Sequence, residues 1–300
     1  MSLLISALIV MGFLGLSFGI GLAYASRVFH VEVDPRVEQA EAALPGANCG
    51  ACGEPGCSGY AQAVVAGTAE PNLCAPGGPE VAANLAAILG LEAGEFVPKV
   101  AVIQCSGGYA ESPRRADYRG FSSCAGAEII SGGDKACTYG CLGYGDCVAA
   151  CAFDALAMSD NGLPVVFEGA CTACGACVDA CPRNIITLIP TSQPVYLSCV
   201  SGDKAKDVKA VCSVGCTGCG VCAKAKTTPS GKLVMENNRP EIPADWEDFE
   251  GACQKCPQGG FVVREPGERR LAVALAEAAA AAAAKEAAKA AEKAAEKPTE

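Results

Sequence analysis

Four closely spaced cysteines in the middle of the chain carry its clearest chemistry. They are separated by two, two and three residues, and a proline follows: Cys171, Cys174, Cys177, Cys181 and then Pro182. Such spacing puts three thiolates on one tight loop, where they can bind three corners of a cubane iron–sulfur cluster, while the fourth reaches a second cluster. Zinc is the alternative, but zinc sites usually show two separated pairs and often a histidine, and the only histidine, His30, is distant in sequence. The run therefore predicts a [4Fe–4S] site.

A second group of cysteines lies nearer the N-terminus. Three are clustered and one is distant: Cys49, Cys52, Cys57 and Cys74. These thiolates can close around another [4Fe–4S] cluster, and the glycines between them let backbone N–H groups approach the sulfurs. Residues 58–66 are predicted to be helical, with Tyr60, Ala63 and Val64 on one face. A structural zinc site is the alternative here too.

The cysteine pattern of the middle of the chain repeats towards its C-terminal end. The apolar run 100–105 predicts a strand, and residues 195–199 repeat that run. The segment that begins Cys137-x3-Cys141 aligns without gaps on the one that begins Cys212-x3-Cys216. We interpret this as an internal duplication.

In the first copy, Tyr144 stands where the run should have its second cysteine, and Cys137 is the predicted substitute. In two-cluster ferredoxins each fourth cysteine binds the other cluster. The predicted ligands are therefore Cys137, Cys141, Cys147 and Cys181 for cluster 2, and Cys151, Cys171, Cys174 and Cys177 for cluster 3.

In the second copy, Lys226 takes the place of the fourth cysteine, and only one downstream cysteine keeps its proline. This copy is therefore predicted to have kept one cluster and lost the other. The ligands predicted for cluster 4 are Cys216, Cys219, Cys222 and Cys256. With the N-terminal set, we expect about four [4Fe–4S] clusters.

Five cysteines remain outside these sets: Cys105, Cys124, Cys199, Cys212 and Cys253. We expect them to be buried thiols, because free cysteines often pack as small hydrophobic residues. The alternative is a further metal centre, since Cys105 and Cys199 hold matching positions in the two copies. Iron well above about sixteen atoms per chain would favour that alternative.

The N-terminal segment has the composition of a membrane span. No charged residue occurs from Leu3 to Ala25, a length sufficient for one transmembrane helix. Residues 23–25 imitate a signal-peptidase site, but no basic residue precedes the segment and its apolar run is longer than that of a signal peptide. Arg27 follows the span and favours that side as cytoplasmic. We expect an uncleaved anchor in the cell (inner) membrane, with the cysteines on its cytoplasmic side.

Composition excludes several kinds of function. The net charge of −10 disfavours nucleic acid as a partner. The 21 cysteines come in metal-binding spacings, which indicates the reducing cytoplasm rather than secreted disulfides. We find no dinucleotide-binding glycine fingerprint and no acid, base or nucleophile constellation. The chemistry predicted here is one-electron transfer.

An apolar span, then NCGACGEPGCSGYAQAV with a distant Cys74, then paired ferredoxin runs resembles the B subunit of the Rnf electron-transport complex. The resemblance covers about residues 1–265. It implies a membrane complex that moves electrons between reduced ferredoxin and NAD, coupled to sodium or proton translocation. It also implies flavin-bearing and membrane-embedded partner subunits, with soluble ferredoxin as the electron donor. Shorter relatives stop after the first ferredoxin pair, so the extra unit marks the longer form.

The expected fold class is α+β, in five parts. These are a transmembrane anchor (1–26), a small [4Fe–4S] domain (27–95), a connector with a two-cluster ferredoxin-like domain (96–190), a degenerate ferredoxin-like unit with one cluster (191–265), and an Ala-rich helical tail (266–300). An alternative function is a membrane-tethered iron–sulfur electron donor that keeps a redox-sensing regulator or another enzyme reduced. A zinc-scaffold protein is the third possibility. Arg114, Arg115 and Arg119 are either an ordinary loop, which we expect, or a docking surface for an acidic ferredoxin.

Overall fold

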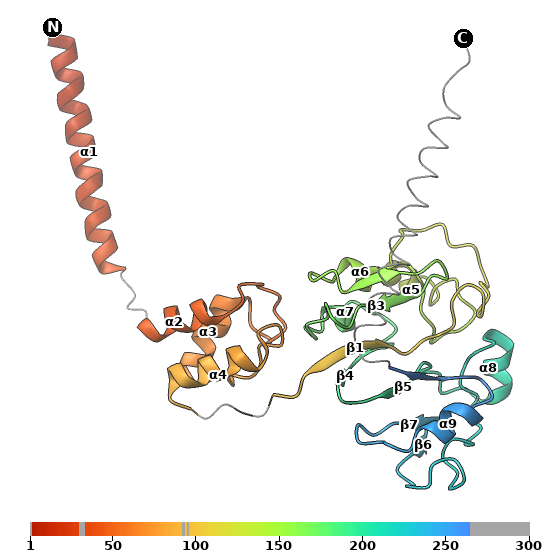
Figure 1. The fold of residues 1–300 in the computed structure, drawn as a ribbon. Coiled ribbons are helices and arrows are strands. Elements are labelled where there is room, and N and C mark those ends of the chain that lie inside the picture. Colours follow the sequence, from red (N-terminus) through yellow and green to blue (C-terminus); the bar gives the residue numbers. More distant parts are fainter. Residues whose placement is uncertain (1, 30–33, 92–93, 95, 265–300) are drawn as a thin grey trace, which may run out of the picture.

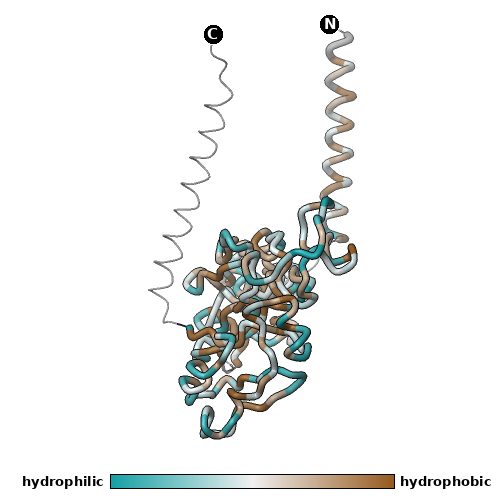
Figure 2. The backbone as a smooth tube through the Cα atoms, turned by 90° about the vertical axis from the view of Figure 1, so that its right-hand side faces the viewer, coloured by the Kyte–Doolittle hydropathy of each residue, from teal (hydrophilic) through white to brown (hydrophobic). Residues whose placement is uncertain are grey.

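The computed structural model describes residues 2–29, 34–91, 94 and 96–264 (Figure 1). The predicted Ala-rich tail lies outside the described residues. Helix α1 (Ser2–Val28) contains a segment, Ile5–Val28, that is long and apolar enough to cross a membrane, with a mean hydropathy of 2.2. None of that segment is buried against the rest of the chain, and it stands apart as an apolar rod (Figure 2). This agrees with the predicted span.

Three helices form the next part of the chain. Helix α2 (Pro35–Ala43) packs against α3 (Cys57–Val65) and α4 (Gly78–Leu89). Their small core is made of Val37, Ala40, Leu44, Tyr60, Ala61, Val64, Cys74 and Leu85. The helix predicted over 58–66 is confirmed, although Ala61 is buried in place of Ala63.

The predicted strands at 100–105 and 195–199 are also confirmed, and each pairs with a strand far along the chain. Strand β1 (Lys99–Ile103) runs antiparallel to β4 (Ile186–Pro190), and β5 (Val195–Leu197) runs antiparallel to β8 (Phe261–Val263). Residues 96–264 thus form one larger region with two halves, 96–190 and 191–264. Each half begins and ends with the two strands of one sheet, which brings its first and last residues together.

Short elements fill the space between these strands. The first half contains α5 (Cys124–Ile129), α6 (Asp146–Ala149), the hairpin β2 (Leu156–Met158) with β3 (Pro164–Val166), and α7 (Ala176–Asp179). The second half contains α8 (Ala205–Val211), the hairpin β6 (Val234–Glu236) with β7 (Arg239–Glu241), and α9 (Glu250–Lys255).

The cores of the two halves differ in composition. Cysteines make up much of the first core, where Cys141, Cys147 and Cys177 are buried with aliphatic residues. The second core is built around Trp246, which is 1% exposed and packs against Phe249 and Phe261 at ring-centroid distances of 6.2 and 5.8 Å. Both cores contain few large apolar side chains. Small cores of this kind usually need additional cross-links, such as metal sites, to stabilise the fold.

An ion pair joins the two halves. The Arg264 guanidinium lies 2.9 Å from the Glu168 carboxylate, and the two side chains are only 8% and 16% exposed. Arg264 also donates hydrogen bonds to the carbonyls of Pro190, Thr191 and Gln193. The end of β8 is therefore fixed to the first half of the region.

Candidate metal centres

The N-terminal cysteine set converges as the spacing predicts. Cys49, Cys52, Cys57 and Cys74 line one cavity beside α3, and we call this site 1. The Asn48 side chain accepts a hydrogen bond of 2.8 Å from the Cys57 N–H. A Cβ at Gly56, whose φ is 107°, would lie 2.9 Å from that same Asn48 oxygen, so the turn requires glycine.

Tyr60 fixes the distant ligand of site 1. Its ring is 1% exposed, and its hydroxyl donates to the Glu70 carbonyl at 2.7 Å and accepts from the Leu73 N–H at 3.1 Å. Both bonds hold the segment that leads into Cys74. Burial raises the pKa of the Cys74 thiol, and the neighbouring Cys57, Cys49 and Cys52 contribute to the same shift.

Three cysteine loops of the larger region share one backbone shape. Each has a left-handed glycine four residues after its first cysteine: Gly145, Gly175 and Gly220, with φ of 84°, 84° and 67°. Tyr144 therefore occupies the position that Cys174 and Cys219 hold in the other two loops. Its ring packs edge-on against Tyr118 at 5.5 Å, so the loop keeps its shape but lacks one thiol.

Site 3 brings together the cysteines predicted for it. Cys177 is buried, and the thiols of Cys171, Cys174 and Cys151 interact with it electrostatically. Burial, together with these three cysteines, raises the pKa of Cys177 to about 11. The Ala155 N–H donates to the Cys151 sulfur at 3.3 Å, a type of bond that stabilises thiolate ligands.

Site 2 differs from the predicted set in one residue. One cavity is lined by three of the predicted cysteines, Cys141, Cys147 and Cys181, and its fourth cysteine is Cys124. The predicted fourth ligand, Cys137, lines a different cavity. Besides burial, Cys124 and Cys181 are the main causes that raise the pKa of Cys147 to about 12. Spacing favoured a cysteine near in sequence, whereas the chain reaches this cavity through α5.

Two side chains next to site 2 ligands hold α5 in place. Asp146, beside Cys147, accepts hydrogen bonds from the N–H groups of Cys124 and Ala125 at 2.9 and 3.0 Å and from the Ser123 hydroxyl at 2.9 Å. Desolvation acts to raise the pKa of Asp146, but these bonds outweigh it and lower the pKa. On the other side, Arg183 forms an ion pair of 2.5 Å with Glu128 of α5.

The structure brings together the cysteines predicted for site 4. Its cavity is lined by Cys216, Cys219, Cys222 and Cys256. Lys226, which replaces the fourth cysteine of the run, is exposed to solvent and contributes nothing to a metal site. Cys253 packs against the Trp246 core, as expected for a buried thiol.

The placement of the cysteines in these sites favours clusters over single ions. Among the residues that the structure describes, no three His, Cys, Asp or Glu side chains are placed to hold one metal ion together. Zinc draws its four ligands to within about 2.3 Å of one centre. Four cysteines around an enclosed space instead fit a cubane, whose four irons each take one thiolate.

The arginine-containing loop is anchored to the protein. Arg114 pairs with Asp134 at 3.1 Å and lies over the Tyr109 ring at 5.0 Å, and Arg115 donates to the Gly133 carbonyl at 3.0 Å. Arg119 alone is highly exposed, and it pairs with Asp117. Two of the three cations therefore have structural partners, in agreement with the expected ordinary loop.

Two families match the cysteine-rich segments. Residues 44–76 match the family described as "Putative Fe-S cluster", and residues 136–186 match the family described as "4Fe-4S dicluster domain". These segments contain site 1 and most of sites 2 and 3.

Similar proteins cover more of the chain. It is 50% identical over 207 residues to the B subunit of the Na(+)-translocating ferredoxin:NAD(+) oxidoreductase complex of Acetobacterium woodii, across 69% of this chain and 62% of that protein. It is 41% identical over 264 residues to the B subunit of the ion-translocating oxidoreductase complex of Methanosarcina acetivorans, across 88% of this chain and 99% of that protein. The proton-translocating counterpart of Clostridium ljungdahlii is 40% identical over 217 residues, which are 72% of this chain and 76% of that protein. The chain therefore belongs to the family of B subunits of ion-translocating oxidoreductase complexes.

Proposed function

We propose that this chain is the electron-relay subunit of a membrane complex that couples electron transfer between ferredoxin and NAD to translocation of sodium ions or protons. The observation that carries the proposal is the convergence of cysteines, four at a time, on separate cavities within a chain of this family. The relatives include one named for sodium and one named for proton translocation, so the proposal covers either ion.

The ligand sets that we propose follow the observed cavities at sites 1, 2 and 4, and at site 3 the cysteines that surround Cys177. They are Cys49, Cys52, Cys57 and Cys74 for site 1; Cys124, Cys141, Cys147 and Cys181 for site 2; Cys151, Cys171, Cys174 and Cys177 for site 3; and Cys216, Cys219, Cys222 and Cys256 for site 4. Bound [4Fe–4S] clusters supply one-electron transfer at potentials that their surroundings set.

The residues of this chain control those surroundings in two ways. Burial keeps water from the sulfurs and raises the pKa of Cys141 and Cys147 to about 12 and of Cys222 to about 11, so free thiols must give up protons when metal binds. Backbone N–H groups approach the sulfurs, as the Gly260 N–H does at 3.4 Å from Cys256. Such bonds favour the more negative, reduced state.

We further propose the domain layout and topology expected from the sequence. Residues 1–26 form a single-pass anchor, residues 27–95 the first cluster domain, 96–190 a two-cluster ferredoxin-like domain, and 191–265 a one-cluster ferredoxin-like unit. The clusters face the cytoplasm, where soluble ferredoxin can donate electrons and where flavin-bearing subunits accept them. The apolar, unburied segment Ile5–Val28 of α1 supports the anchor.

The function is tested on the full chain tagged in its native host and purified anaerobically from membranes. We expect flavin-bearing and multi-span subunits to co-purify, and reduced ferredoxin to bleach the visible absorption of the complex with NADH formed on addition of NAD. Purification with a redox-sensing regulator and without those subunits would instead favour the tethered electron donor. Absence of any reduction by ferredoxin would refute the relay.

A further inference from the structure

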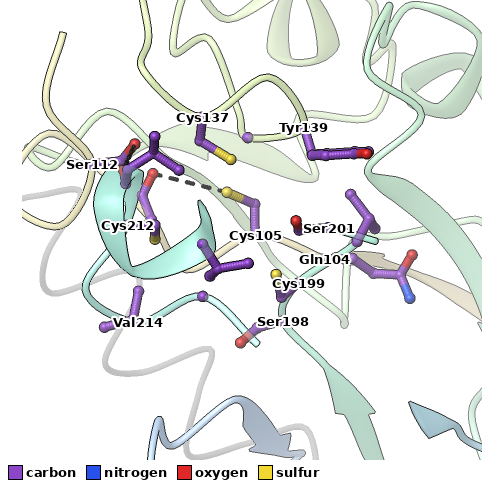
Figure 3. Close-up of a pocket in the computed structure, with 16 residues that line it drawn as sticks. Gln104, Cys105, Ser112, Cys137, Tyr139, Ser198, Cys199, Ser201, Cys212 and Val214 are labelled. Carbon is purple, nitrogen blue, oxygen red and sulfur yellow. Dashed lines mark hydrogen bonds between the residues drawn. The ribbon is translucent and has the colours of Figure 1, made fainter. Parts of the chain in front are cut away.

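A further cavity lies between the two halves and is lined by four cysteines assigned to no other site. The cysteines around it are Cys105, Cys137, Cys199 and Cys212 (Figure 3). Its volume is about 20 Å³, the same as that of the cavities at sites 1, 2 and 4. It is therefore comparable in size to those proposed cluster sites.

The four cysteines form two equivalent pairs. Cys105 and Cys199 follow the first strand of their respective halves and face each other across an antiparallel β-bridge. Cys137 and Cys212 each stand four residues before the first cysteine of a loop, at Cys141 and Cys216. Each half thus contributes cysteines at the same two positions, so equivalent residues of the two halves meet at the cavity.

Backbone contacts repeat with the same symmetry. The Cys141 N–H donates to the Cys105 sulfur at 3.4 Å. In the other half the Cys216 N–H hydrogen-bonds to the Cys199 sulfur, where it partly opposes the effect of burial on the pKa of that thiol. Donors aimed at sulfur in this way are typical of thiolate ligands to a metal cluster.

A glycine lies beside one of these sulfurs in each half. A Cβ at Gly140 would lie 3.4 Å from the Cys137 sulfur, and one at Gly215 would lie 3.6 Å from the Cys212 sulfur, both ordinary contact distances. The two glycines are again equivalent positions, so the backbone passes close to a sulfur in both halves.

A buried cation lies next to the cavity. Lys135 is 4% exposed, and its ammonium donates to the carbonyls of Cys141, at 2.9 Å, and Gly107. Gly107 itself lines the cavity. A buried positive charge is costly unless a negative group lies near, and a cluster with four thiolates would provide that group.

We propose that Cys105, Cys137, Cys199 and Cys212 bind a fifth [4Fe–4S] cluster. Each thiol loses one proton to solvent as its sulfur binds one iron, so four protons leave. Cys141 connects this site to site 2, because its thiol lines the site 2 cavity while its N–H donates to the Cys105 sulfur. Cys216 connects it to site 4 in the same way, because its thiol lines the site 4 cavity while its N–H donates to the Cys199 sulfur. The new site therefore lies between sites 2 and 4. This inference extends the proposed relay and in that respect rests on it.

The test is iron and acid-labile sulfide analysis of the full chain, purified anaerobically, with native mass spectrometry to count clusters. We expect about twenty irons and as many sulfides in the unsubstituted chain, since each cluster holds four of each. Cys199→Ser and Cys212→Ser should each lose about four irons, and the double variant should lose no more than either single one, because both changes remove one cluster. Cys253→Ser, at a cysteine outside every set, is the matched control and should lose none.

The unsubstituted chain decides the matter even if a variant fails to fold. A count of about sixteen irons in four clusters would overturn the fifth site and leave the proposed relay standing. Independent losses at Cys199 and Cys212 that add in the double variant would also overturn it. Failure of ferredoxin to reduce a five-cluster chain would instead overturn the relay and leave the site intact.

Discussion

Replacement of Asp146 by alanine tests whether Cys124 is a ligand of site 2. The Asp146 carboxylate accepts three hydrogen bonds from the start of α5, at 2.9 to 3.0 Å. A hydrogen bond to a charged group contributes about 1.5–3 kcal/mol, and loss of a helix cap costs about 1 kcal/mol. Since Asp146 is only partly buried, we expect Asp146→Ala to weaken the attachment of α5 by about 2–4 kcal/mol. That is enough to populate states in which Cys124 has left the cavity.

The readout is the iron and sulfide content of the anaerobically purified full chain, with EPR spectra of its reduced form. We expect a loss of up to about four irons, confined to one cluster signal. Asp146→Asn keeps one acceptor oxygen and should lose less. Asp179→Ala, at an exposed acidic residue of α7, is the control and should change nothing. Full iron content with an unchanged spectrum in Asp146→Ala would refute the placement of Cys124 at site 2.

Three further changes test the forces that hold the sites. Arg264→Met removes a largely buried ion pair and three hydrogen bonds to backbone carbonyls, so it should lower the free energy of unfolding by about 3 kcal/mol. An unchanged melting temperature, measured without oxygen, would contradict this. Tyr60→Phe leaves the Leu73 N–H and the Glu70 carbonyl without their partner, which should lower the free energy of unfolding by about 1–2 kcal/mol. Iron should then leave site 1 faster when a chelator is added, and equal release rates in the two proteins would argue against this role of Tyr60. Removal of all iron by oxidation and chelation should abolish cooperative unfolding followed by circular dichroism, because the metal holds these small cores together; a sharp transition in the iron-free chain would disprove this.

Local spacing indicated most of the cysteines that the structure brings together. Sites 1, 3 and 4 gather the predicted cysteines because three of the four ligands in each lie on one loop, whose conformation the intervening glycines dictate. The apolar runs at 100–105 and 195–199 formed strands for a similarly local reason.

The placement of Cys124 and Cys137 could not be predicted from spacing. Cys124 reaches site 2 because Asp146 and Arg183 hold α5 against it, contacts that join residues far apart in the sequence. Cys137 instead meets a cavity that exists only where the two halves pack together. The sequence did carry one signal of that cavity, the matching positions of Cys105 and Cys199, but nothing in it showed that the two copies face each other.

The central claim is that these thiolates bind iron–sulfur clusters. The most direct test is metal and sulfide analysis of the intact chain, made and kept without oxygen. We predict about twenty irons with an equal amount of acid-labile sulfide, which leaves one of the 21 cysteines free of metal. A chain that contained zinc in place of iron, or no metal and disulfide-bonded cysteines, would contradict the account.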